Sequence, residues 1–247
     1  MALFEARHLH KRFGAQVVLE EINLSFEAGK LSGIMGPNGA GKTTCFNVLT
    51  GRYRPDRGQV LFEGHDITGL PPRKIAALGV SRSFQLISLF DDFSVRENVL
   101  IALPEVRAQG FNLTRDLLTD RAALERASAV LARVGLAGKE TLRAKDLSYG
   151  ERRALEIGVA LATEPRILFL DEPTSGLGTA GTLRLAELVG ALKQHYTLVV
   201  IEHDMRFLFR LADRISVIHW GQVIAEGTPD ELRANPWVRA SQLGDAA

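Results

Sequence analysis

Several features that define other classes of protein are scarce in this sequence. One cysteine among 247 residues excludes an internal disulfide, which is typical of a reducing compartment. Lysine and arginine number 30 against 29 aspartates and glutamates, so charge gives no basis for nucleic acid as the main partner. No apolar run reaches the roughly 18 residues of a membrane span, and the first residues lack the apolar stretch of a signal peptide. We therefore expect a soluble, cytoplasmic protein of one large domain or two small ones.

Glycine, by contrast, is concentrated in the stretch GIMGPNGAGKTTCF, which begins at Gly33. A tight turn needs only one or two glycines, whereas spaced glycines leave successive backbone N–H groups free to surround an anion. The residues from Gly36 to Thr43 complete the pattern G-x-x-x-x-G-K-S/T, and we name them the phosphate loop. The alternative is a glycine-rich turn in which the lysine and threonine follow by accident.

The segments on either side favour the phosphate-binding interpretation. Residues 31–35 form a short apolar run that predicts a buried strand, and residues 44–50 can form a helix that Gly51 ends. A helix that starts directly after the loop adds its own N-terminal N–H groups to the site. Lys42 would reach the terminal phosphates, and Thr43 would offer its hydroxyl to a magnesium ion. The sequence therefore predicts a site for a nucleoside triphosphate.

A pair of acids follows the apolar run 167–170. An acid that emerges from a buried strand near a phosphate loop can hold magnesium through water, which fits Asp171. Glu172 would then accept a proton from the attacking water or orient it. The alternative is that both acids are solvated or cap a helix. Ser148 and Glu151 leave a similar choice open, because their capping box opens either an ordinary helix or an anion site at a helix N-terminus.

The pattern of apolar residues predicts an α/β fold. Continuous apolar runs at 167–170 and 198–201 indicate central parallel strands, and 180–195 reads as a helix between them. Alternating runs at 22–27 and 60–63 indicate an antiparallel sheet with one solvated face. Within 180–195, the apolar stripe expected to face the core consists of Leu183, Ala186, Leu188 and Leu192. The middle of the chain, about 94–144, is expected to be helical, with a capping box at Ser94 and a second apolar stripe at 120–134. Residues 215–218 and 222–225 predict a hairpin, and a capped helix should follow Thr228.

The motifs at 36–43, 147–151 and 167–172, in this order, resemble those of the nucleotide-binding subunit of an ATP-binding cassette (ABC) transporter. The resemblance covers nearly the whole chain. It implies a single ABC ATPase domain, 1–247, with the P-loop NTPase fold: a central, mainly parallel sheet, an antiparallel β subdomain and a helical subdomain. The catalytic core would comprise 1–85 and 161–247, and the helical subdomain about 86–160.

The resemblance also implies roles for single residues. Phe13 would stack on adenine, Gln85 would touch magnesium and water, and His203 would contact the γ-phosphate. Ser148 and Gly150 would contact the ATP held by a second subunit. The implied catalytic residues are Glu172, His203, Lys42 and Gln85, and the implied magnesium ligands are Thr43, Gln85 and Asp171. The implied nucleotide-binding residues are Phe13, Gly36, Pro37, Asn38, Gly39, Ala40, Gly41, Lys42, Thr43, Thr44, Gln85, Ser148, Gly150, Asp171 and His203.

Four segments point to one branch of this family. GVSRSFQ, LSYGERRALEIG, IEHDM and GTPDELRANPWV resemble the LivG-type ATPases of branched-chain or other hydrophobic amino-acid importers. The lipopolysaccharide-export ATPase ranks second, because its switch segment usually lacks the Glu-His-Asp-Met form, and urea or amide importers remain open. Cassette ATPases of DNA repair or translation usually carry coiled-coil insertions or two fused cassettes, for which this chain has no room.

The implied partners follow from the same resemblance. They are integral membrane permease subunits, a second ATPase subunit in an ATP-dependent homodimer or heterodimer, and a periplasmic solute-binding protein, with no nucleic acid. The chain would lie peripherally on the inner face of the cell membrane. The apolar segment 86–93 either docks the permease, with Phe90 and Phe93 as anchors, or fills the helical core.

Four positions depart from the commonest family pattern. Tyr149 and Glu151 replace the glycine and glutamine of the signature, as is usual in this branch. Gly178 stands where an aspartate or asparagine generally follows, and Val159 stands where many relatives have arginine. The last two leave the strength of coupling between subunits open.

Overall fold

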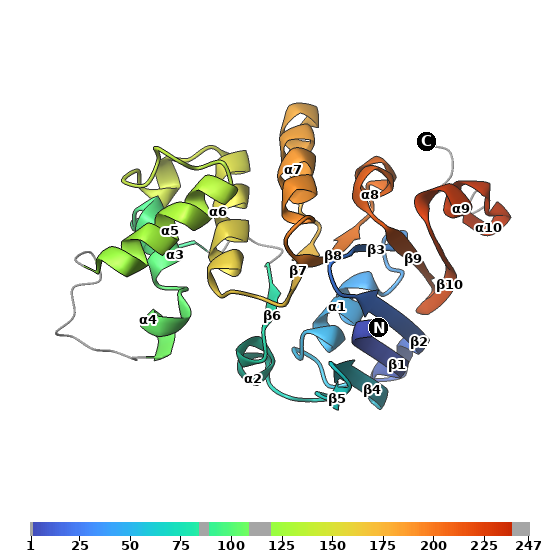
Figure 1. The fold of residues 1–247 in the computed structure, drawn as a ribbon. Coiled ribbons are helices and arrows are strands. Elements are labelled where there is room, and N and C mark those ends of the chain that lie inside the picture. Colours follow the sequence, from blue (N-terminus) through green and yellow to red (C-terminus); the bar gives the residue numbers. More distant parts are fainter. Residues whose placement is uncertain (1, 84–88, 109–119, 239–247) are drawn as a thin grey trace.

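The computed structural model describes residues 2–83, 89–108 and 120–238, and its strands form two sheets (Figure 1). The smaller sheet consists of β1 (Ala2–Phe13), β2 (Gln16–Glu27), β4 (Arg57–Phe62) and β5 (His65–Asp66). Its strands pair antiparallel in the order β2-β1-β4-β5. In β2, Leu24 and Phe26 are buried and Ser25 between them is exposed, which confirms the alternating pattern at 22–27. Residues 60–62 of β4 are all buried, so the alternation expected at 60–63 was wrong, although the antiparallel strand is present.

The larger sheet is mainly parallel. It consists of β3 (Leu31–Met35), β6 (Val80–Arg82), β7 (Ile167–Asp171), β8 (Thr197–Glu202), β9 (Arg214–His219) and β10 (Gln222–Gly227). The order is β10-β9-β3-β8-β7-β6, and only the edge strand β10 pairs antiparallel. Every residue of β3, β7 and β8 is buried, which confirms the prediction from continuous apolar runs.

The central sheet is covered on both sides, because successive residues of a strand face opposite directions. Phe169 and Ile201 pack with α1 (Lys42–Leu49) and with the antiparallel sheet. Leu170 and Val200 lie in a second core with residues of α7 (Thr179–Leu192) and α8 (Met205–Leu211). The carboxyl ends of parallel strands meet at one edge of a sheet, so the loops after β3, β7 and β8 share that edge.

A group of helices lies to one side of both sheets, at the left of Figure 1. It consists of α3 (Val95–Leu100), α4 (Pro104–Ala108), α5 (Arg121–Arg133) and α6 (Tyr149–Ala162). The other short helices are α2 (Pro72–Ala77), a 3₁₀ turn (Ala144–Asp146), α9 (Pro229–Ala234) and α10 (Pro236–Val238). The capping boxes predicted at Ser94, Ser148 and Thr228 are all present.

The apolar stripe predicted on α7 was partly wrong. Leu183 is 48% exposed, and the buried residues are Leu185, Ala186, Val189 and Leu192. With 3.6 residues per turn, these positions form one row, whereas Leu183 lies outside it. The helix itself is correct, Ala186 and Leu192 are buried as predicted, and Leu188 is partly buried against the same core.

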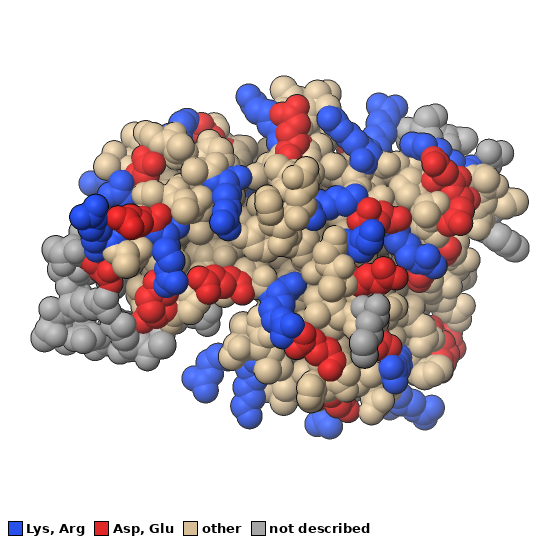
Figure 2. Space-filling view, viewed as in Figure 1, with Lys and Arg blue, Asp and Glu red and all other residues tan. Residues whose placement is uncertain are grey.

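No helix in the described ranges is both long and apolar enough to cross a membrane. Acidic and basic side chains are interspersed over the face shown in Figure 2, without a broad area of one sign. This arrangement agrees with the near balance of charge in the sequence.

Candidate nucleotide site

The phosphate loop between β3 and α1 follows a path that glycine alone allows at Gly36. A Cβ atom there would lie 2.1 Å from the carbonyl oxygen of Ile218 on β9. At Gly41 the φ angle is 100°, and a Cβ atom would lie 2.8 Å from the carbonyl oxygen of Val18. The N–H of Gly221 donates to the carbonyl of Ala40 at 3.0 Å. The loop is therefore fixed against both sheets by close backbone contacts, which the absence of side chains makes possible.

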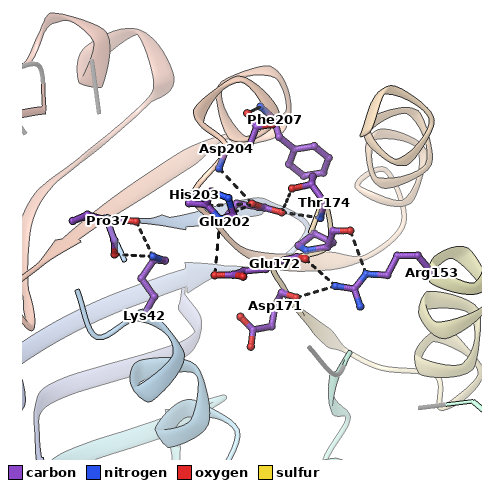
Figure 3. Close-up of polar contacts among 12 residues, drawn as sticks. Pro37, Lys42, Arg153, Asp171, Glu172, Thr174, Glu202, His203, Asp204 and Phe207 are labelled. Carbon is purple, nitrogen blue, oxygen red and sulfur yellow. Dashed lines mark hydrogen bonds and ion pairs between the residues drawn. The ribbon is translucent and has the colours of Figure 1, made fainter. Parts of the chain in front are cut away.

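Lys42 begins α1 and is 4% exposed. Its ammonium donates to the carbonyl oxygens of Gly36 at 2.7 Å and Pro37 at 2.9 Å, inside its own loop (Figure 3). Burial lowers the pKa of Lys42, and the charges of nearby acids, led by Glu172, oppose that shift. Thr43, next on the helix, is exposed. The loop therefore holds a positive charge at the N-terminus of α1.

Asp171 ends β7 and is 3% exposed. Within the described part of the chain, its Oδ1 atom has no hydrogen-bond partner. Burial, and then the charge of Glu172, raise the pKa of Asp171 to about 6. The next residue, Glu172, has a φ of 43° in the left-handed region, and its N–H donates to the carbonyl of Ile201 at 2.8 Å. Such a conformation is costly for a residue other than glycine and is common at functional sites.

Glu202, at the end of β8, is fully buried and is not among the residues predicted from the sequence. Its carboxylate accepts hydrogen bonds from the Thr174 N–H at 2.8 Å, the Thr174 hydroxyl at 2.6 Å and the His203 N–H at 3.1 Å (Figure 3). An acid that ends an apolar strand and precedes His203 was a signal that could have identified it. We name Asp171, Glu172 and Glu202 the acidic cluster.

His203 lies beside this cluster. Its Nδ1 atom is 3.9 Å from Oε1 of Glu172 and 3.8 Å from Oε2 of Glu202. The ring is half-exposed, with 52% of the side-chain surface accessible. Strands β7 and β8 are neighbours, so their ends bring His203 and Glu172 together although they are distant in sequence.

A second residue that the sequence analysis missed is Arg153 on α6. It is 1% exposed and donates to the backbone carbonyl of Glu172 at 2.9 Å. A charged residue on the apolar side of a helix, with Glu156 one turn later, was the available signal.

The remaining predicted site residues are less tightly grouped. Phe13 ends β1, is 45% exposed and packs edge-to-face on Tyr53 at 5.4 Å, so it is not a core residue. Ser148 and Gly150 line a cavity of about 930 Å³ that also includes residues of α7 and not the phosphate loop. Gln85, and residues 86–88 of the predicted docking segment, lie outside the described residues.

Comparison with known proteins identifies the class that this fold and site represent. Residues 19–175 match the family model for ABC transporters, and residues 222–247 match the model for branched-chain amino acid ATP-binding cassette transporters. The chain belongs to the ABC transporter family and is an ATP-binding cassette ATPase. The predicted family and fold class are thereby confirmed.

Individual relatives narrow the class further. The chain is 40% identical over 251 residues to the high-affinity branched-chain amino acid transport ATP-binding protein LivG of Escherichia coli, covering 99% of this chain and 98% of that protein. It is 34% identical to the lipopolysaccharide export system ATP-binding protein LptB of Acidithiobacillus ferridurans, covering 98% and 97%. Among solved structures, the ADP conformation of MJ1267, an ATP-binding cassette of an ABC transporter, matches with a TM-score of 0.87 at 29% identity, covering 99% of this chain and 100% of that one.

Proposed function

We propose that this ATPase powers the import of branched-chain or other hydrophobic amino acids. The observation that carries the proposal is the full-length similarity to LivG, combined with the match of residues 222–247 to the branched-chain cassette model. LptB is also similar over nearly the whole chain, but at the lower identity of 34%. Lipopolysaccharide export is therefore the second candidate.

The binding half of the mechanism rests on the phosphate loop. The amides of Gly36–Thr43 and the N-terminus of α1 surround the β- and γ-phosphates, and Lys42 exchanges its loop carbonyls for phosphate oxygens. Phe13, exposed at the end of β1, stacks on the adenine. The base and the phosphates are thus held by different elements of the same chain.

The donor set at the loop fits magnesium. This ion takes oxygen ligands and is held by one or two protein groups together with substrate phosphates. Asp171 offers a buried carboxylate oxygen without a described partner, and Thr43 offers an exposed hydroxyl at the start of α1. We assign magnesium to Thr43 and Asp171, with Gln85 as a further ligand. When bound, the ion would neutralise charge that develops on the phosphates.

Hydrolysis itself is assigned to Glu172 and His203. Glu172 accepts the proton of the attacking water, because its carboxylate lies at the edge where the loops after β3 and β7 meet. His203 contacts the γ-phosphate and lies 3.9 Å from Glu172. Glu202 does not act on the nucleotide; it holds the backbone of His203 through the hydrogen bond to its N–H.

Dimerisation and membrane docking complete the proposal. Two copies, or this chain and a related subunit, enclose ATP between one phosphate loop and the Ser148–Gly150 segment of the other. The permease docks beside Phe90, which is 56% exposed, and a neighbouring cavity of about 660 Å³ lined by Leu89 and Val159. The chain would then lie on the cytoplasmic face of the membrane, with residues 86–160 as the helical subdomain and a periplasmic protein supplying the solute.

The identity of the transported solute is tested by measuring transport in the assembled complex. We would co-express the chain with the permease and binding protein of a branched-chain amino-acid importer and measure ATP-dependent uptake into proteoliposomes, with leucine and urea as alternative substrates. We expect the wild-type complex to take up leucine and the Glu172→Gln variant to abolish this uptake. Uptake of urea alone, or release of lipopolysaccharide instead of uptake, would overturn the assignment of the solute.

A further inference from the structure

Arg153 is among the most deeply buried side chains of the molecule, with 1% of its surface exposed. It lies in the second turn of α6, and its guanidinium reaches the segment that follows β7 (Figure 3). Its Nη1 atom pairs with the carboxylate of Glu156 at 2.6 Å, and that carboxylate is itself buried. The pairing neutralises a charge that could not otherwise remain in the interior.

The other donors of the guanidinium converge on consecutive backbone carbonyls. Nη2 donates to the carbonyl oxygens of Asp171 at 3.1 Å and Glu172 at 2.9 Å, and Nε donates to that of Pro173 at 3.2 Å. A planar group with five fixed N–H donors can satisfy several acceptors at once, whereas lysine presents its donors from a single atom. The turn that contains Glu172 is therefore organised around one side chain from another element.

This turn needs such support, because Glu172 has a φ of 43°. A residue other than glycine keeps that conformation only when its surroundings determine it. One constraint is the N–H of Glu172, which donates to Ile201 on β8. The other constraint is the carbonyl of Glu172, which accepts a hydrogen bond from Arg153. The two contacts together fix the direction in which the carboxylate leaves the backbone.

We propose that Arg153 is a positioning residue for ATP hydrolysis, which orients Glu172 by holding the backbone of residues 171–173 from α6. The inference rests on the proposed role of Glu172 as the acceptor of the water proton. The guanidinium of Arg153 is directed at backbone carbonyls and at Glu156, so we expect it to affect the rate of hydrolysis and not the affinity for ATP. Glu156 has a separate part, because it neutralises the guanidinium and fixes its orientation.

The test compares hydrolysis with binding in the purified full chain. Arg153→Met combined with Glu156→Leu removes both charges together, since deleting one alone would leave the other buried without its partner. Thermal melts first establish that this double variant folds. We expect its kcat to fall by about 10-fold or more, because small displacements of a catalytic group have large effects on rate. Its affinity for a fluorescent ATP analogue should stay close to that of the wild type.

Arg153→Lys keeps a positive charge beside Glu156 and provides a second measurement if the double variant is unstable. It should also lower kcat without changing affinity, because one ammonium cannot hold three carbonyls and a carboxylate in the same geometry. Arg152→Lys is the matched control on the same helix, and the contacts of Arg152 run to Asp91 and Ala144 instead. This control should hydrolyse ATP at the wild-type rate.

The outcomes separate this inference from the proposed function. If Glu172→Gln is inactive but a folded Arg153 variant hydrolyses ATP normally, the positioning role is wrong and the role of Glu172 stands. If Glu172→Gln hydrolyses ATP normally, the proposed role of Glu172 is wrong. A loss of ATP affinity that accounts for the loss of activity in folded Arg153 variants would also contradict the positioning role.

Discussion

The phosphate loop after β3 and the acidic cluster at the ends of β7 and β8 face the same site but are made of different groups. The loop consists mainly of backbone, and Gly36 and Gly41 allow it to pack against β9 and β2. The acidic cluster consists of carboxylates, of which Asp171 and Glu202 are almost fully buried. The loop therefore offers dipoles that are the same at any ordinary pH, whereas the cluster holds charges at some cost in stability.

This difference in composition predicts different roles for the phosphate loop and the acidic cluster. In the proposed mechanism, backbone amides and Lys42 bind phosphates in the ground state as well as during the reaction, so changes there should alter affinity. Glu172 would act on the water and Asp171 on the ion, so changes there should alter the rate. Variants on the two sides should consequently separate into two kinetic classes.

The largest effect is expected for Glu172→Gln. The variant keeps the size of the side chain but loses the acceptor for the water proton, so kcat should fall by about 10² to 10⁴-fold. ATP binding should remain, because Lys42 and the loop amides are unchanged. Turnover and nucleotide binding are measured on one preparation, with the exposed residue Glu27→Gln as control. Near-normal hydrolysis would remove Glu172 from the mechanism.

Lys42→Ala should fall in the other class. Loss of a charged hydrogen-bond donor to the phosphates typically costs about 1.5–3 kcal/mol, which corresponds to roughly 10- to 100-fold in ATP affinity. Equilibrium titration with a fluorescent ATP analogue measures the change, and Lys30→Ala, at an exposed position before β3, is the control. An unchanged affinity would contradict the assignment of the phosphate loop.

Asp171→Asn tests the cost of the acidic cluster in the metal-free, nucleotide-free protein. The pKa of Asp171 is raised from 3.8 to about 6, which corresponds to roughly 3 kcal/mol of destabilisation above pH 6 as an upper estimate. Because the folded state binds the proton more tightly than the unfolded state does, wild-type stability falls as pH rises from about 4 through 6. Asparagine cannot ionise, so the variant should be more stable by about 1–3 kcal/mol at pH 8.

Chemical denaturation of both proteins at pH 8 and pH 4 measures this difference. The advantage of Asp171→Asn should disappear at pH 4, where the wild-type carboxyl is protonated in the folded state. Asp230→Asn, at a side chain that is 90% exposed, is the control. If the variant is less stable than the wild type at pH 8, interactions within the protein offset the cost of burying the ionised carboxylate of Asp171.

The same comparison explains which parts of the molecule could be predicted from the sequence. The phosphate loop, the strands that flank it and the capping box at Ser148 depend on neighbouring residues, so local spacing was sufficient. The contacts of Glu202 and Arg153 depend on strand order and on the packing of α6, which spacing does not encode. The prediction that Leu183 faces the core was wrong for a related reason. Several rows of a mainly apolar helix can face the core, and tertiary packing selects one.

Phe90→Ala tests whether the surface beside the helical group is a contact or a core. Phe90 is 56% exposed and stacks on Phe93 at 5.2 Å, so its truncation should cost the isolated subunit less than about 1 kcal/mol. A buried aromatic would instead cost about 3–5 kcal/mol. The thermal melt distinguishes these values. In the assembled complex, we expect ATP hydrolysis to continue while transport falls; normal transport would exclude Phe90 as an anchor for the permease.

The smallest effect is expected at Gly178, which is the N-cap of α7 and makes no side-chain cap hydrogen bond. Its φ of −73° and ψ of 173° suit any residue, and a Cβ atom there would meet nothing within 4 Å. Gly178→Asp should therefore stabilise the protein by about 0.5–1 kcal/mol, partly by capping α7 and partly by restricting the unfolded chain. Gly178→Ala also restricts the unfolded chain, but alanine has no capping oxygen and is a poorer N-cap than glycine. The difference in stability between the two variants in urea denaturation therefore measures the effect of an aspartate relative to an alanine at the cap. Equal stability of the two variants would mean that the aspartate does not cap the helix, and that glycine at this position costs the free subunit only backbone entropy.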